Sequence, residues 1–155
     1  MITQILVAVD GSDYALRAAR LGAEILTGSV SGTLTLLTIA KSQVGLEWYQ
    51  GPGTALDQVP EQERQALDEA FKKGQEILEQ AQKVCLDLLK DTAVRLETLI
   101  VPGDPAQKII EAAENTPGQI IVIGSRGAGP LKGALLGSVS QKVLANSPIP
   151  VLIVK

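Results

Sequence analysis

Two short runs of apolar residues constrain the fold of this chain more than any other feature of its sequence. Residues 5–9 read Ile-Leu-Val-Ala-Val and are closed by Asp10-Gly11-Ser12, and residues 120–123 read Ile-Ile-Val-Ile and are closed by Gly124. Neither run alternates polar with apolar residues, a pattern typical of strands buried on both faces. The sequence therefore predicts an α/β protein with an open parallel sheet and helices on both of its faces.

The rest of the chain alternates between helical and strand patterns. After the first strand, Ser12 or Asp13 can cap a helix that Gly28 ends, and Asp104-Pro105 has the residue types of another helix start. The expected series is a strand at 5–9, a helix at 12–28, a strand at 33–39, a loop at 40–59, a long amphipathic helix at 60–90, a strand at 94–99, a helix at 105–115, a strand at 119–124, a helix at 139–146 and a strand at 151–154.

This order of elements predicts five strands joined by right-handed helical crossovers. The strand at 94–99 carries Arg95 and Glu97 between apolar residues, as expected of a strand at the edge of the sheet. The 155 residues are 45% hydrophobic, enough to bury one core without a metal or disulfide. We therefore expect one domain spanning residues 1–155.

Composition excludes several classes of function. The chain has no histidine, which rules out Ser-His-Asp and Cys-His catalysis and histidine metal sites. Its single cysteine, Cys85, cannot form an internal disulfide and is expected in the core. A net charge of −3 with no basic run makes nucleic acid and anionic membranes poor partners. No basic segment precedes the first apolar run, so we expect neither export nor a membrane span, and a cytoplasmic protein.

The candidate site lies where the first and fourth strands end. In open parallel sheets, ligands bind beyond the carboxyl ends of the strands, at the point where the strand order reverses. The first strand brings Asp10 to this point, and the fourth brings the segment 124–140, which contains five glycines. Gly137-Ser138 immediately precedes a helix, whose free amides and dipole favour an anion. This arrangement predicts a phosphate cradle; the alternative is that the glycines only shape a loop.

Standard nucleotide motifs are absent: no Gly-Lys pair occurs, so there is no Walker motif, and no G-x-G-x-x-G is present. However, Gly124, Gly127 and Gly137-Ser138 reproduce the spacing G-x2-G-x9-G-[S/T]. In this the chain resembles the nucleotide-binding branch of the universal stress protein family. The resemblance extends to the opening strand with Asp10, to the segment 101–106 and to the closing segment 147–154, and leaves out the loop with Trp48.

The resemblance implies a Rossmann-like or flavodoxin-like sheet of order 3-2-1-4-5 that binds ATP or AMP, with magnesium, in a homodimer. Asp10 would assist the magnesium ion or the ribose, and Ile39 would contact the adenine. Lys132 is either a ligand of the terminal phosphate or a solvated lysine. The resemblance further assigns adenosine contacts to Ala8, Val9 and Asp10, ribose and phosphate contacts to Gly124, Ser125, Arg126, Gly127, Ala128, Gly129 and Pro130, and phosphate contacts to Gly127, Gly137, Ser138, Val139 and Ser140.

Three functions remain open at this point. The first is an ATP-binding regulatory or signalling protein in the stress response. The second is a slow ATPase, for which Asp10 is the one plausible group to orient water. The third is a dimerising stress protein that binds no nucleotide, against which the intact glycine motif argues. The sequence does not decide whether ATP, AMP or a cyclic nucleotide is the native ligand.

The closing strand also predicts a homodimer. In the order 3-2-1-4-5, residues 151–154 form an edge strand that is apolar throughout and has no charge to protect it. Antiparallel pairing with the same strand of a second copy would satisfy its free backbone groups and cover its side chains. The alternative is that the loop at 40–59 covers this edge.

Overall fold

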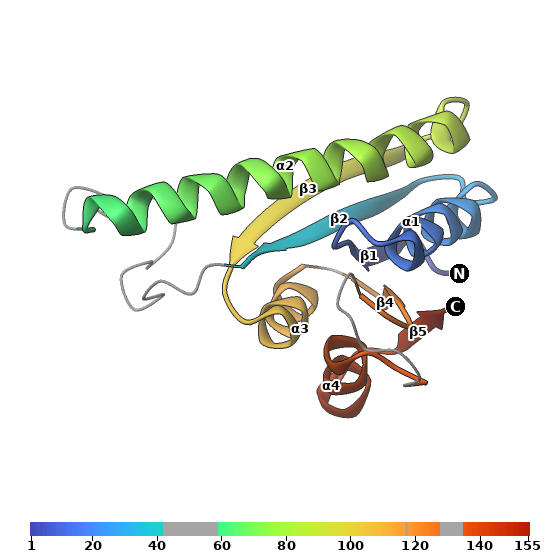
Figure 1. Cartoon of the computed structure of the whole chain (residues 1–155). Helices are drawn as coiled ribbons and strands as arrows, with labels where there is room; N and C mark the ends of the chain where they lie inside the picture. Colours follow the sequence, from blue (N-terminus) through green and yellow to red (C-terminus); the bar gives the residue numbers. More distant parts are fainter. Residues whose placement is uncertain (42–58, 117, 128–134) are drawn as a thin grey trace.

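The computed structural model describes residues 1–41, 59–116, 118–127 and 135–155. Strands and helices alternate along these residues (Figure 1). In chain order they are β1 (Gln4–Ala8), α1 (Asp13–Leu26), β2 (Gly32–Ala40), α2 (Glu61–Leu89), β3 (Val94–Pro102), α3 (Pro105–Asn115), β4 (Ile120–Gly124), α4 (Ser138–Asn146) and β5 (Val151–Val154).

The strands form one parallel sheet in the order β3-β2-β1-β4-β5. At the centre, Ala8 of β1 lies opposite both Leu37 of β2 and Ile123 of β4. The carboxyl ends of these three strands are therefore level. The order reverses between β1 and β4, so the predicted fold and its switch point are both confirmed.

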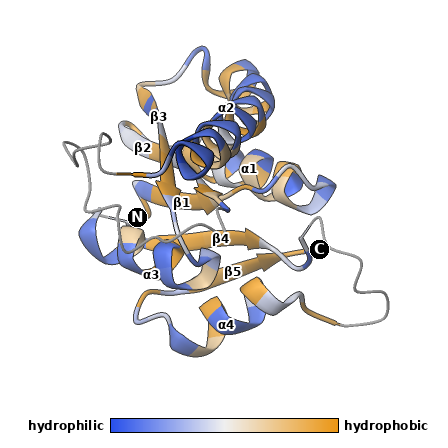
Figure 2. Cartoon of the chain, turned by 60° about the vertical axis from the view of Figure 1, so that its left-hand side comes forward, coloured by the Kyte–Doolittle hydropathy of each residue, from blue (hydrophilic) through white to orange (hydrophobic). Residues whose placement is uncertain are grey.

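Two helical layers cover the sheet, α1 and α2 on one face and α3 and α4 on the other (Figure 2). Alternate residues of β1 serve the two layers: Val7 packs in the cluster with α1 and α2, whereas Leu6 and Ala8 pack in the cluster with α3 and α4. Because both faces of β1 are covered, both need apolar side chains. This explains why the run 5–9 shows no polar alternation.

The helix starts follow the sequence signals. Ser12 is the N-cap of α1, and its Oγ accepts a hydrogen bond of 3.2 Å from the amide of Ala15. Asp104 caps α3 in the same way, by accepting from the amide of Gln107 at 3.1 Å. Gly11, between β1 and Ser12, has φ +85°, a conformation that favours glycine. The turn after β1 is therefore built for a tight entry into α1.

Helix α2 is longer than the strands it covers. Its 29 residues span about 43 Å, whereas the nine residues of β2 span about 30 Å. Its buried residues begin at Gly74 and continue to Leu89, and residues 61–73 include none. The amino-terminal part of α2 consequently extends past the carboxyl ends of β2 and β3 (Figure 1).

The two edges of the sheet differ in charge. On β3, Arg95 and Glu97 lie 3.7 Å apart as an exposed ion pair, in agreement with the expected edge strand. On β5, all four residues are half-buried and apolar. The expected loop at 40–59 falls almost entirely outside the described residues. Within the described ranges, no helix is long and apolar enough to cross a membrane.

Candidate functional site

A cavity of about 590 Å³ opens at the carboxyl ends of β1, β2 and β4. Most of the residues that the sequence points to line it. They are Ala8, Val9, Asp10, Ile39, Gly124, Arg126, Gly127, Gly137, Ser138, Val139 and Ser140. Ser125 is buried beside them but is not part of the lining. Ala128, Gly129, Pro130 and Lys132 lie outside the described residues.

One wall of the cavity is the start of α4, which is tied to the end of β4. The amide of Gly137 donates to the carbonyl of Ser125 at 2.7 Å. The Ser140 hydroxyl lies 3.0 Å from the carbonyl oxygens of both Ser125 and Gly137 and donates to them. Gly137 is the N-cap of α4, so no side chain caps the helix. The first-turn amides of α4 therefore have no partner within the helix, an arrangement suited to an anion.

Asp10 and Gly127 bring the loops after β1 and β4 together. Asp10 Oδ1 accepts a hydrogen bond of 3.0 Å from the amide of Ser12. A Cβ atom at position 127 would lie 2.7 Å from Asp10 Oδ2. Any side chain at this position would displace the carboxylate, so the second glycine of the motif keeps Asp10 in place at the switch point.

The first glycine of the motif has a different role. A Cβ atom at Gly124 would lie 2.7 Å from Cβ of Tyr14 and 2.9 Å from its backbone carbonyl carbon. Gly124 therefore allows the first turn of α1 to pack directly on the end of β4. This contact also places the Tyr14 side chain at the cavity, with the guanidinium of Arg17 4.8 Å from the centre of its ring.

An apolar wall faces the helix start from the α3 side. It consists of Ala8, Leu37, Ile39, Pro105 and Ile109, from β1, β2 and α3. The sequence pointed to Ala8 and Ile39 but missed the other three. Pro105 and Ile109 belong to a helix that crosses from β3 to β4, and its position over the cavity depends on packing that no motif encodes.

A third wall comes from the opposite face of the sheet and was missed entirely. It consists of Thr38 of β2 and of Ala70, Lys73, Gly74 and Ile77 of α2. The charged groups of the described lining are three cations, on Lys41, Lys73 and Arg126, and the carboxylate of Asp10. The cavity thus combines an apolar wall, free helix amides and a net positive lining.

These features agree with comparisons of the chain with known proteins. The model of the universal stress protein family matches residues 1–155. The chain belongs to this family. A relative in Bacillus subtilis, universal stress protein YxiE, is 35% identical over 156 residues, covering all of both chains.

Solved universal stress proteins have the same fold. Protein MJ0577 of Methanocaldococcus jannaschii superposes with a TM-score of 0.80 at 26% identity, covering 100% of this chain and 96% of that one. A universal stress protein in complex with cAMP superposes with a TM-score of 0.69 at 27% identity, covering 99% of this chain and 97% of that one. The shared fold extends over the whole chain.

The described lining of this universal stress protein site has few groups that could hold a metal ion. Within the described part of the chain, no three His, Cys, Asp or Glu side chains come together to hold a metal ion. Asp10 is the one carboxylate of the described lining. A divalent cation there would take its other ligands from phosphate oxygens and water, as Mg²⁺ commonly does.

Proposed function

We propose that this chain binds an adenine nucleotide, ATP or AMP, in the cavity and acts as a nucleotide-responsive regulatory protein. One observation carries the proposal: free helix amides, the Asp10–Gly127 contact and an apolar wall converge on one cavity at the switch point. The complex of a related universal stress protein with cAMP supports the choice of an adenine nucleotide. As part of this proposal, we assign the chain to the nucleotide-binding branch of the family.

The phosphates occupy the start of α4 in this proposal. Gly127, Gly137, Ser138 and Val139 line the cavity there, and the first amide hydrogen bond within α4 is donated only by Gln141. The Ser140 hydroxyl already donates to two carbonyl groups, so Ser140 contributes its amide rather than its hydroxyl. The base and ribose lie on the apolar wall, because a flat ring system gains most from burial against aliphatic side chains.

In this proposal, Asp10 would either bind a Mg²⁺ ion that the phosphates also bind, or accept a hydrogen bond from a ribose hydroxyl. Either role uses a carboxylate that is fixed by the Ser12 amide and neighboured by Gly127. With one lining carboxylate and no histidine, the described site offers little for rapid hydrolysis. A regulatory role therefore fits better than the alternative of a slow ATPase, and we place the protein in the cytoplasm as one domain.

The test is to identify nucleotide released from freshly purified protein by mass spectrometry and to titrate ATP and AMP by calorimetry. Val at position 137 would meet Cα of Arg126 and the amide of Gly127, which lie 3.3 and 3.5 Å from an added Cβ. Gly137→Val should therefore abolish binding and leave the fold intact. Gly28→Val is the matched control, because an added Cβ there meets nothing within 4 Å. Unchanged affinity of Gly137→Val would refute the phosphate assignment, and phosphate release would favour the ATPase.

A further inference from the structure

The α2 side of the cavity has polar groups that the site described so far does not use. Thr38 projects from β2 toward α2, Lys73 comes from the part of α2 next to Gly74, and Lys41 follows the end of β2. All three side chains line the cavity, on the side away from the start of α4. None belongs to the glycine motif.

Thr38 is a buried polar residue without an internal partner. It is 2% exposed, and its methyl group faces α2, where a Cβ at Gly74 would lie 3.2 Å from Cγ2. Its hydroxyl makes no hydrogen bond to another side chain or backbone group in the described ranges. Because Oγ1 is not one of the buried polar atoms that lack a partner, this hydroxyl is accessible from the cavity, and a group that enters can accept a hydrogen bond from it.

Lys41 and Lys73 add positive charge to the cavity that Thr38 lines. Both are exposed, and neither forms an ion pair with an acidic residue that the structure describes. Their ammonium groups are consequently available to a ligand. A hydroxyl and two ammonium groups that line one cavity can together recognise phosphate, since all three can donate to its oxygens.

These groups and the start of α4 lie at opposite sides of the cavity. Ala8 pairs with Leu37 of β2 and with Ile123 of β4. Thr38 and Gly124 are the next residues of these two strands, so they lie at the same level along the sheet. The strand β1 lies between them, which puts β2 and β4 about 10 Å apart. A phosphoryl group at the start of α4 therefore lies across β1 from Thr38, and we expect that a second anionic group is needed to reach Thr38 and Lys73.

We propose that Thr38, Lys73 and Lys41 form a second phosphate subsite, and that the preferred ligand is an adenine nucleotide with phosphoryl groups on two different carbons of the ribose. This inference rests on the proposed function and specifies its ligand class. A nucleotide with all its phosphates on the 5′ carbon fills the α4 side alone. A nucleotide with a further phosphate on the 3′ carbon engages both sides.

The experiment compares adenosine 3′,5′-bisphosphate with ADP and AMP by calorimetry without Mg²⁺. ADP carries as many phosphoryl groups as the bisphosphate but holds both on one carbon, so it controls for charge. Lys73→Ala should weaken the bisphosphate about tenfold, as expected for one charge-assisted hydrogen bond, and leave ADP and AMP within about twofold. Thr38→Val should act in the same direction without lowering Tm, because the hydroxyl it removes has no internal partner.

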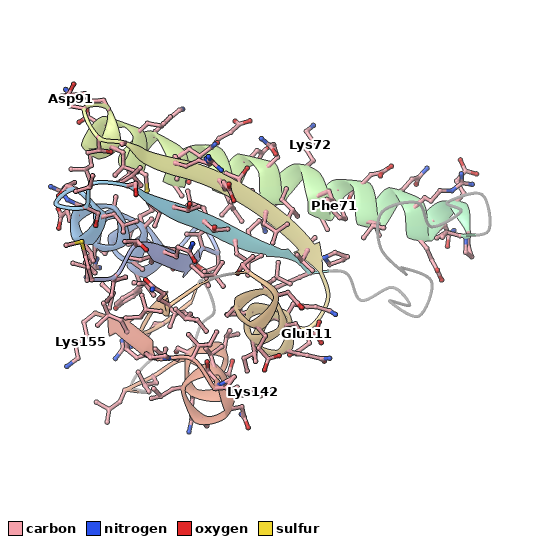
Figure 3. All side chains as sticks on the ribbon, turned by 180° about the vertical axis from the view of Figure 1, so that it is seen from behind. Phe71, Lys72, Asp91, Glu111, Lys142 and Lys155 are labelled. Carbon is pink, nitrogen blue, oxygen red and sulfur yellow. The ribbon has the colours of Figure 1, made fainter. Side chains whose placement is uncertain are left out.

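Lys72→Ala is the matched control, since Lys72 is adjacent on α2 but points away from the sheet (Figure 3). It should bind all three nucleotides as the unmodified protein does. If AMP and ADP bind but Lys73→Ala and Thr38→Val leave the bisphosphate unaffected, the subsite is wrong and the proposed function stands. If the unmodified protein binds none of the three, both proposals fail.

Discussion

Replacing Gly124 by alanine tests whether the first glycine of the motif serves packing rather than the ligand. The added Cβ would lie 2.7 Å from Tyr14 Cβ, 2.9 Å from the Tyr14 carbonyl carbon and 3.1 Å from the Ala15 nitrogen. Two of these three atoms are backbone of the first turn of α1, so they cannot rotate out of the way. Helix α1 would have to move away from β4.

The size of the effect follows from these contacts. Overpacking costs about 1–3 kcal/mol, and a clash with backbone belongs in the upper half of that range, so we expect the free energy of unfolding to fall by about 2–3 kcal/mol. For a chain of this size, that corresponds to a Tm lower by roughly 4–12 °C. Gly127→Ala is the matched comparison, because its Cβ meets the flexible end of Asp10 at 2.7 Å. Gly127→Ala should lower the free energy of unfolding by less than about 0.5 kcal/mol but weaken nucleotide binding.

Urea unfolding and calorimetry of both variants without ligand measure these differences, and nucleotide titration completes the comparison. The reasoning is refuted if Gly124→Ala unfolds with the stability of the unmodified protein. It is equally refuted if Gly127→Ala is the less stable of the two.

Three further predictions concern other parts of the molecule. Asp10→Ala should weaken nucleotide binding measured by calorimetry; a lower Tm with unchanged affinity would show that Asp10 serves only the turn to Ser12. Ile153→Lys should make the protein monomeric in light scattering, because charge on β5 opposes pairing with a second copy; a monomeric unmodified protein, or a variant that stays dimeric, would contradict this. Burial raises the pKa of the Cys85 thiol to about 12, above its ordinary 9.0. The native thiol should therefore resist alkylation at pH 8. The contribution of the protonated thiol to the free energy of unfolding should be fully present below pH 9.0 and be lost as the pH rises toward about 12. Rapid labelling without denaturant would argue against this burial.

The fold could be predicted from the sequence because its strongest signals are local. The runs at 5–9 and 120–123 have the composition of doubly covered strands, and the caps Ser12 and Asp104 mark helix starts within a few residues. Boundaries shifted by small amounts: the strand expected at 94–99 continues to Pro102, where it stays paired with β2. Such extensions depend on the neighbouring strand rather than on the residues themselves.

The site could be predicted only where its residues are close in sequence to the glycine motif or to the end of β1. Thr38 and Lys73 are far apart in the chain, and they line the same cavity because α2 packs on β2 through the close approach of Gly74 to Thr38. A glycine within a long amphipathic helix was a usable sign of close packing, but it does not reveal which strand approaches. Pro105 and Ile109 were missed for the same reason, since the crossover of α3 decides their place.

The uneven burial of α2 gives this helix two levels of local stability. From Gly74 to Leu89 its buried residues tie it to the core, so its amides there should exchange with solvent only when much of the domain opens. Residues 61–73 have no buried member, and this end can fray at small free-energy cost. Because Ala70 and Lys73 also line the cavity, a bound ligand would extend protection along the helix. Ligand binding would therefore lower the fraction of molecules in which the amino-terminal turns of α2 are open. The exposed surface of these turns would change in this way with no change of fold.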